Sequence, residues 1–128
     1  MERQNINAAG TIPPVGGGYS NAVQILEFKR IVFVSGQVPM EPDGTVPEGF
    51  AAQCRRAWRN VEAQLLAADM RLQNVVKVTT FLGDRAYGKE NRVVRKEFLG
   101  DLNPALTTIV CDIFDEAWLL EIEVIAAA

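Results

Sequence analysis

The sequence contains no histidine, which removes the commonest general acid–base near neutral pH and the commonest metal ligand. Ser-His-Asp catalysis, Cys-His catalysis and His-containing zinc sites are therefore excluded. Only two cysteines are present, Cys54 and Cys111, and both lie in apolar surroundings far apart in the chain. We interpret them as buried, reduced thiols, and we expect no metal site.

Clustered positive charge is also missing. Lys and Arg number 13 against 16 Asp and Glu, the net charge is −3, and basic residues gather only in short groups such as Arg55-Arg56 or Arg92-Arg95-Lys96. Because nucleic-acid binding requires a basic patch or stripe, we expect no nucleic-acid partner. No apolar run approaches the roughly 18 residues of a membrane span, and the N-terminus lacks an apolar signal segment, so we expect a cytoplasmic protein without a membrane partner.

The rest of the composition is that of an ordinary globular protein. Of the 128 residues, 48% are hydrophobic and 23% are charged, which provides enough apolar material for a core. Glycine and proline are scattered, and the chain shows no internal repeat or linker. We therefore expect one domain that spans residues 1–128.

The first half of the sequence predicts strands followed by a long helix. Residues 22–28 and 31–38 are β-prone and are separated by Lys29-Arg30, which predicts a hairpin, with an optional short strand at residues 4–7 before it. The run at residues 31–38 is apolar on both faces, which predicts a strand buried on both sides. Apolar residues at spacings of three and four then predict a helix, and they are Phe50, Cys54, Ala57, Trp58, Val61, Leu65 and Ala68.

The second half predicts a strand at residues 75–82, a helix at 87–99, and closing strands at 106–113 and 118–126. In the last strand, apolar residues alternate with a second set that includes two acids. Strand–helix–strand connections are right-handed, so both helices should cover one face of one mixed sheet in an α+β fold. We expect the second face to pack against other copies of the chain.

Six segments, in order along the chain, resemble motifs of the RidA/YjgF family, the reactive-intermediate deaminases. The first has glycine at residue 18, where the family usually has proline. The segments are GYSNAV at 18–23, VSGQVP at 34–39, Gln53 with Asn60-Val61 in the long helix, NVVKVTTFL at 74–82, Asn91 with Phe98 in the second helix, and LEIEVIA at 120–126.

This resemblance implies a chorismate-mutase-like fold and a homotrimer whose three sheets form a central barrel. It also implies pockets between subunits that bind a small-molecule metabolite without a cofactor. In active members these pockets hydrolyse enamines and imines to a keto acid and ammonia, and the acid at the position of Glu121 positions or activates water. The substrate-binding residues that the resemblance implies are Tyr19, Ser35, Gly36, Asn91, Leu106 and Thr107.

The sequence departs from the family at one substrate-binding position. Members carry a Pro-Ala-Arg-Ser/Thr motif, whereas this chain has Leu106 in place of the arginine. A guanidinium binds a carboxylate through two parallel hydrogen bonds, and leucine offers neither charge nor donor. Three alternatives stay open: another cation such as Arg85 or Arg30 replaces the arginine, the ligand is less anionic at that end, or the pocket binds without catalysis.

Simpler explanations exist for individual residues. Glu121 and Glu123 share one face of their strand, and acids in such a position are usually exposed to solvent. Glu121 would be suited to acid–base catalysis with water only if it lay in a pocket near Leu106. Tyr19 follows three glycines and is either a plain loop aromatic or part of a flexible flap over a pocket. Ser35-Gly36 is either part of a binding site or a structural feature of its strand, namely a bulge or a close approach of the backbone.

Three functions compete at this stage. The first is an enzyme that adds water to an imine or enamine, with a specificity altered by Leu106. The second is a trimer that senses or sequesters a small molecule without turnover. The third is RNA cleavage, a label that some relatives carry, which the lack of histidine and the acidic net charge make the weakest. A Glu121→Ala variant separates the first two, because it should abolish an activity and leave binding largely intact.

Overall fold

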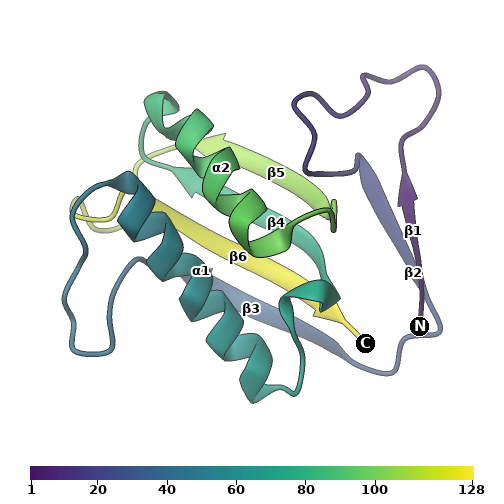
Figure 1. Ribbon diagram of the computed structural model, residues 1–128, viewed down its shortest axis with the longest axis horizontal. Helices are drawn as coiled ribbons and strands as arrows, with labels where there is room; N and C mark the ends of the chain where they lie inside the picture. The colour runs from purple at the N-terminus through teal and green to yellow at the C-terminus, as the bar shows by residue number, and fades with distance from the viewer.

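The computed structural model describes residues 1–128, and its centre is a four-stranded mixed sheet with two helices on one face (Figure 1). The strand order is β3 (Ile31–Gln37), β6 (Leu120–Ala127), β4 (Val75–Leu82) and β5 (Ala105–Val110). Strand β6 is antiparallel to β3 and β4, whereas β4 and β5 are parallel. The predicted α+β fold, with two helices covering one face of a mixed sheet, is confirmed.

The two helices are the connections between parallel strands. Helix α1 (Phe50–Ala67) links β3 to β4, and helix α2 (Gly88–Leu99) links β4 to β5. Short 3-10 turns, η1 (Leu72–Asn74) and η2 (Arg85–Tyr87), precede β4 and α2. Neither helix is long and apolar enough to cross a lipid bilayer.

The predicted hairpin of residues 22–28 and 31–38 is wrong. Strand β2 (Ala22–Leu26) pairs with β1 (Glu2–Ile6) in a separate antiparallel ribbon, and β3 pairs with β6 instead. The Lys29-Arg30 link lacks the Asn-Gly or Gly-X pair that a two-residue hairpin turn favours. Its two backbone N–H groups instead donate to the carbonyl of Ala128, at 2.8 Å each, so the link joins the end of β6.

The core lies between the helices and the covered face of the sheet. The apolar stripe of α1 is buried from Phe50 to Leu65 as predicted, and it packs on alternate residues of β4 and β6. Trp58 of α1 stacks on Phe98 of α2, with ring centroids 6.0 Å apart. Cys54 is fully buried in this layer, whereas Cys111 is only half-buried, and both thiols are free.

The opposite face of the sheet is open in the single chain. Phe33 of β3 is 70% exposed, and Ile31 on the same strand and Ile109 on β5 are also exposed. Within one protomer β3 is therefore buried on one side only, because the helices cover only one face, and its predicted burial on the second side depends on other copies of the chain. We call the two surfaces the covered face and the open face.

Candidate functional site

A pocket of about 310 Å³ lies where α2, β5 and the loop of residues 7–21 meet. This volume is at the small end of the range for ligand sites, roughly 300–1,000 Å³. Its wall contains three of the residues predicted to bind substrate. The lining residues are Val15, Tyr19, Gly88, Asn91, Arg92, Arg95, Leu106 and Thr108. We call this cavity the α2 pocket.

Strand register places two β5 side chains in the α2 pocket. Leu106 pairs with Val78 and Thr108 pairs with Thr80, and both partners are buried on the covered face. Side chains alternate along a strand, so Leu106 and Thr108 point toward α2 rather than toward the open face. Leu106, the residue at which the resemblance implies a departure from the family motif, therefore lies in the wall of this cavity.

The loop that brings Tyr19 to the pocket is anchored at its C-terminal end. The backbone N–H of Ser20 donates to the carbonyl of Pro104 at 3.0 Å, and its hydroxyl donates to the carbonyl of Asn103 at 2.8 Å. The hydroxyl of Tyr19 accepts a hydrogen bond from the backbone N–H of Val15 at 2.9 Å. Tyr19 is thus held at the pocket wall by the loop's own contacts and by the start of β5.

Arg95 of α2 has the least ordinary environment in the pocket. It is only 5% exposed, yet its guanidinium donates no hydrogen bond within the chain and forms no ion pair. Burial lowers the pKa of Arg95, and the positive charge of Arg92 lowers it further. No nitrogen of Arg95 is among the fully enclosed, unpaired side-chain atoms, so the guanidinium of this buried side chain opens into the pocket, where water or an anion can reach it.

Asn91 lies one turn before Arg95 and is 3% exposed. Its side-chain oxygen is 3.8 Å from the thiol sulfur of Cys54, which donates to it. Burial raises the pKa of the Cys54 thiol to about 12, so this thiol stays protonated and can serve as the donor. Cys54 therefore orients Asn91 and is not a nucleophile.

Glu121 belongs to the open face, not to the α2 pocket. It pairs with Phe81 of β4, which in turn pairs with Ile109 of β5. This row alternates with the row of Leu106, so within one protomer Glu121 and Leu106 lie on opposite faces of the sheet. The condition for acid–base work, a pocket location of Glu121 near Leu106, is therefore not met within a single chain.

Ser35 and Gly36 accompany Glu121. The register of β3 against β6 shifts between Val34 and Gln37, which marks a β-bulge at these two residues. A Cβ atom on Gly36 would overlap the carboxylate of Glu121. The glycine is therefore required for the close approach of the acid, and both structural explanations of this dipeptide hold.

Thr107 also points toward the open face. Its hydroxyl is 2.6 Å from the ammonium nitrogen of Lys77, which donates to it. Thr107 is thus separated from Leu106 and Thr108, its neighbours in sequence, which line the α2 pocket. No group of three or more Cys, Asp or Glu side chains is placed to hold a metal ion.

The predicted residues therefore form two groups. Tyr19, Asn91 and Leu106 meet in the α2 pocket, whereas the other four lie on or beside the open face. That second group is Ser35, Gly36, Thr107 and Glu121. Neither cation suggested as a replacement lies in the pocket: Arg30 donates to the carbonyls of Ala68 and Asp69 at 2.8 and 3.4 Å, and Arg85 is exposed in η2.

Sequence reasoning missed Arg92, Arg95 and Thr108. A signal for Arg95 exists, because it follows Asn91 by four residues and residues at this spacing share one helix face. Asn91 was singled out on the resemblance, and the residue one turn further along the same face lines the same wall. A signal for Thr108 exists as well. Side chains two residues apart on a strand point to the same face, so Thr108 shares the face of Leu106.

Comparisons with known proteins agree with this fold. The sequence model of the family described as Endoribonuclease L-PSP matches residues 10–128. The rat protein named 2-iminobutanoate/2-iminopropanoate deaminase is 35% identical over 117 residues, which cover 89% of this chain and 82% of the rat protein.

Two solved structures are similar over nearly the whole chain. A putative endoribonuclease from Thermotoga maritima is 32% identical, covers 91% of both chains and has a TM-score of 0.74. A protein of unknown function of the conserved Rid family from Yersinia pestis covers both chains completely with a TM-score of 0.87. At 24% identity, the second likeness shows the fold alone.

Proposed function

Because the chain belongs to the RidA/YjgF family, also described as the endoribonuclease L-PSP family, we propose that it hydrolyses imines or enamines of small metabolites to carbonyl compounds and ammonia. The relative named as an iminobutanoate and iminopropanoate deaminase supports this reaction class. We do not propose RNA cleavage, because the chain has no histidine and a net charge of −3.

The observation that carries the proposal is the separation of the site residues onto two faces of the sheet. The α2 pocket holds Tyr19, Asn91 and Leu106 but no carboxylate, and Glu121 lies on the open face with exposed apolar neighbours. An exposed apolar sheet face is typical of an interface between copies. In the proposed homotrimer, the open face of one protomer brings Glu121 to the α2 pocket of the next.

The reaction then needs only water and one carboxylate. The carboxylate of Glu121 accepts a proton from water while the water oxygen bonds to the imine carbon, and it passes this proton to the imine nitrogen to give a carbinolamine. Glu121 then moves the hydroxyl proton of the carbinolamine to the nitrogen as the C–N bond breaks, which releases ammonia and leaves the carbonyl group. Gly36 allows the carboxylate to lie directly against β3, which restricts its orientation.

The experiment is a coupled assay in which an amino-acid oxidase generates imines and semicarbazide traps those that escape hydrolysis. The wild type should lower semicarbazone formation, and Glu121→Ala should lose about 10²- to 10⁴-fold of that activity, the usual contribution of a general acid–base. Glu123→Ala is the matched control, because Glu123 shares the strand and the open face, and it should retain activity.

Three results would contradict the proposal. If the wild type does not accelerate hydrolysis of any imine tested, the proposed reaction is wrong, and if Glu121→Ala is as active as Glu123→Ala, the proposed role of Glu121 is wrong. If only a Leu106→Arg variant is active, the chain is a deaminase scaffold without its anchor, and binding without turnover becomes the better account.

A further inference from the structure

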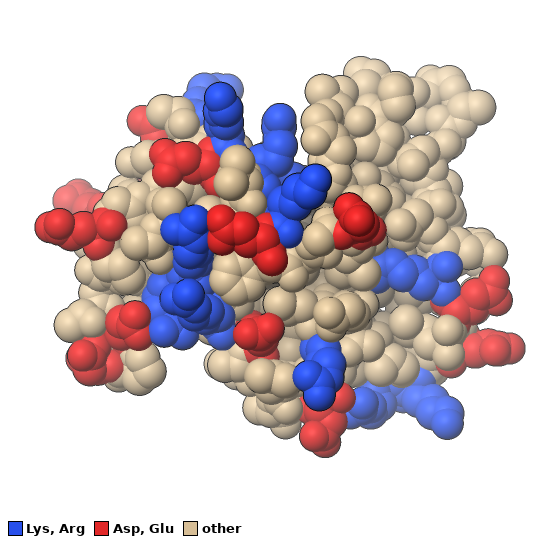
Figure 2. All heavy atoms as spheres, in the orientation of Figure 1, with Lys and Arg blue, Asp and Glu red and all other residues tan.

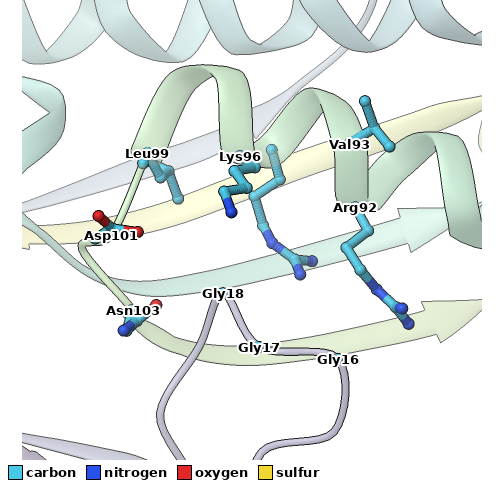
Figure 3. Close-up of a pocket in the computed structure, with 11 residues that line it drawn as sticks. Gly16, Gly17, Gly18, Arg92, Val93, Lys96, Leu99, Asp101 and Asn103 are labelled. Atoms are coloured by element: carbon cyan, nitrogen blue, oxygen red, sulfur yellow. The ribbon is translucent and has the colours of Figure 1, made fainter.

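The free guanidinium of Arg95 lies between two cavities, not one. Beside the α2 pocket lies a second cavity of about 220 Å³, and both are lined by Arg92 and Arg95. The second cavity also contains Lys96 and Asp101, and its floor is the run Gly16–Gly18 (Figure 3). We call it the glycine cavity.

The glycine loop and α2 are fitted closely to each other. A Cβ atom on Gly16 would lie 2.7 Å from a terminal nitrogen of Arg92, and a Cβ on Gly18 would lie 3.5 Å from a terminal nitrogen of Arg95. Gly16 has φ of +78°, a conformation that side chains other than glycine rarely adopt. Gly16 thus lets the backbone approach the guanidinium of Arg92 more closely than a side chain would allow, whereas the approach of Gly18 to Arg95 is an ordinary van der Waals contact.

The charges of this region are unbalanced. Arg92, Arg95 and Lys96 follow one another on α2 within a single turn and a half, and Asp101 is the one acid in either cavity. Figure 2 shows basic side chains on the helix side of the notch between α2 and the loop of residues 7–21, and that loop carries no charged residue. Like charges one turn apart on a helix repel each other, so a bound anion would relieve the repulsion.

We propose that Arg95 replaces the arginine missing at Leu106 as the carboxylate anchor, and that Arg92 and Lys96 bind a second acidic group in the glycine cavity. The preferred ligands are then the imine, and the keto-acid product, of an acidic amino acid. One carboxylate leaves an excess of positive charge across the two cavities, and a second one offsets it. This inference names a substrate class for the proposed function and rests on it in that respect.

The geometry also explains how leucine is tolerated at residue 106. Leu106 and Arg95 line the same pocket from β5 and α2, so a cation on the helix reaches the space that a strand arginine would otherwise occupy. The guanidinium is buried, where its hydrogen bonds to a carboxylate are stronger than in water. The carboxylate anchor of this pocket is thus supplied by helix α2, through Arg95, and not by strand β5.

The test is calorimetric binding of two keto acids of equal chain length, 2-oxoglutarate and 2-oxopentanoate, which differ in the second carboxylate. The wild type should bind 2-oxoglutarate at least about ten-fold more tightly, the size of one charge-assisted contact. Arg95→Gln should weaken both ligands, and Arg92→Gln should weaken only 2-oxoglutarate. Lys89→Gln is the matched control, because Lys89 is on α2 but lines neither cavity.

A structural role for Arg95 is tested in the same samples. Because the guanidinium of Arg95 makes no hydrogen bond or ion pair within the chain, Arg95→Gln should not lower the melting temperature, whereas replacing a structural arginine would leave its partners unpaired and lower it. Adding Leu106→Arg to Arg95→Gln should restore binding of 2-oxopentanoate, because a cation returns to the α2 pocket. If Arg95 only supported the fold, Leu106→Arg would not restore the binding that Arg95→Gln removes.

The inference is overturned if both keto acids bind equally, if neither binds, or if Arg95→Gln binds as the wild type does. These outcomes are distinct from failure of the proposed function. If the wild type binds 2-oxoglutarate through Arg95 yet hydrolyses no imine, the anion site stands and the enzyme proposal fails. If it hydrolyses imines of apolar amino acids and Arg95→Gln is equally active, the enzyme proposal stands and this inference fails.

Discussion

The covered face and the open face of the sheet are made from alternating residues of the same strands, yet they differ in what they bury. On β6, Ile122 is fully buried beneath the helices, whereas Glu121 and Glu123 lie on the side that no element of the chain covers. At the α2 edge of the covered face lies a pocket with two arginines, Arg92 and Arg95, and no acid, whereas the acid Glu121 lies on the open face. The difference indicates that neither face is a complete site.

The sharpest comparison is between two isoleucines of β6, Ile122 and Ile125, which point to opposite faces. Ile122→Ala should lower the free energy of unfolding by about 2–5 kcal/mol, since the covered face cannot refill the cavity. Ile125→Ala should act mainly by weakening self-association, so its effect should shrink as the protein is diluted. Urea unfolding at several protein concentrations measures both, and a concentration-independent loss of equal size for Ile125→Ala would contradict the open-face account.

A smaller effect is expected from Gly36→Ala. The new methyl group would displace the carboxylate of Glu121, which is the flexible end of a side chain, so the protein should fold but hydrolyse imines about ten-fold more slowly. The coupled imine assay measures this loss. In a Glu121→Ala background, Gly36→Ala should have no further effect, because its target is gone. An additional loss in that double variant would show that Gly36 acts through something other than Glu121.

The smallest difference concerns the two thiols. Burial raises the pKa of Cys54 to about 12, so at pH 8 its thiol is protonated and unreactive, because the thiolate is the nucleophile. A chromogenic disulfide reagent should therefore label only Cys111 in the native protein and both thiols in urea. The raised pKa also means that stability from Cys54 is lost as the pH rises from about 9 toward 12, because the unfolded thiol ionises first. Rapid labelling of Cys54 in the native state would contradict its place in the core.

The sequence predicted the layers of the fold well because they depend on local periodicity. The stripe of α1 from Phe50 to Leu65 and the strand at residues 75–82 follow from spacing alone, and the structure has both. The pairing of β2 with β1 did not follow, because Lys29-Arg30 contains no turn signal and strand pairing is not a local property. The same limit applies to β3, whose apolar open side is exposed in one chain.

The candidate site was predictable only in part for a related reason. Tyr19, Asn91 and Leu106 meet in one pocket, whereas Thr107, which the resemblance also implies, lies on the other face of the sheet because side chains alternate along β5. The cation of the pocket was sought at Arg30 and Arg85, because a search by residue type cannot say which arginine has a free guanidinium. Arg95 is distinguished by a buried side chain whose guanidinium lines two cavities and has no partner within the chain, which depends on the tertiary structure.

Subunit complementation tests most directly whether the two faces complete one site between protomers. Glu121→Ala removes the acid, and Thr108→Trp fills the α2 pocket from β5, so each variant alone should be inactive in imine hydrolysis. Equal amounts are unfolded together, refolded and assayed beside each variant refolded alone. Random assembly joins an intact pocket to an intact acid in about a quarter of the clefts, one half times one half, so about a quarter of wild-type activity should return. If the mixture is no more active than its parents, the acid and the pocket do not meet between protomers, and the account is wrong.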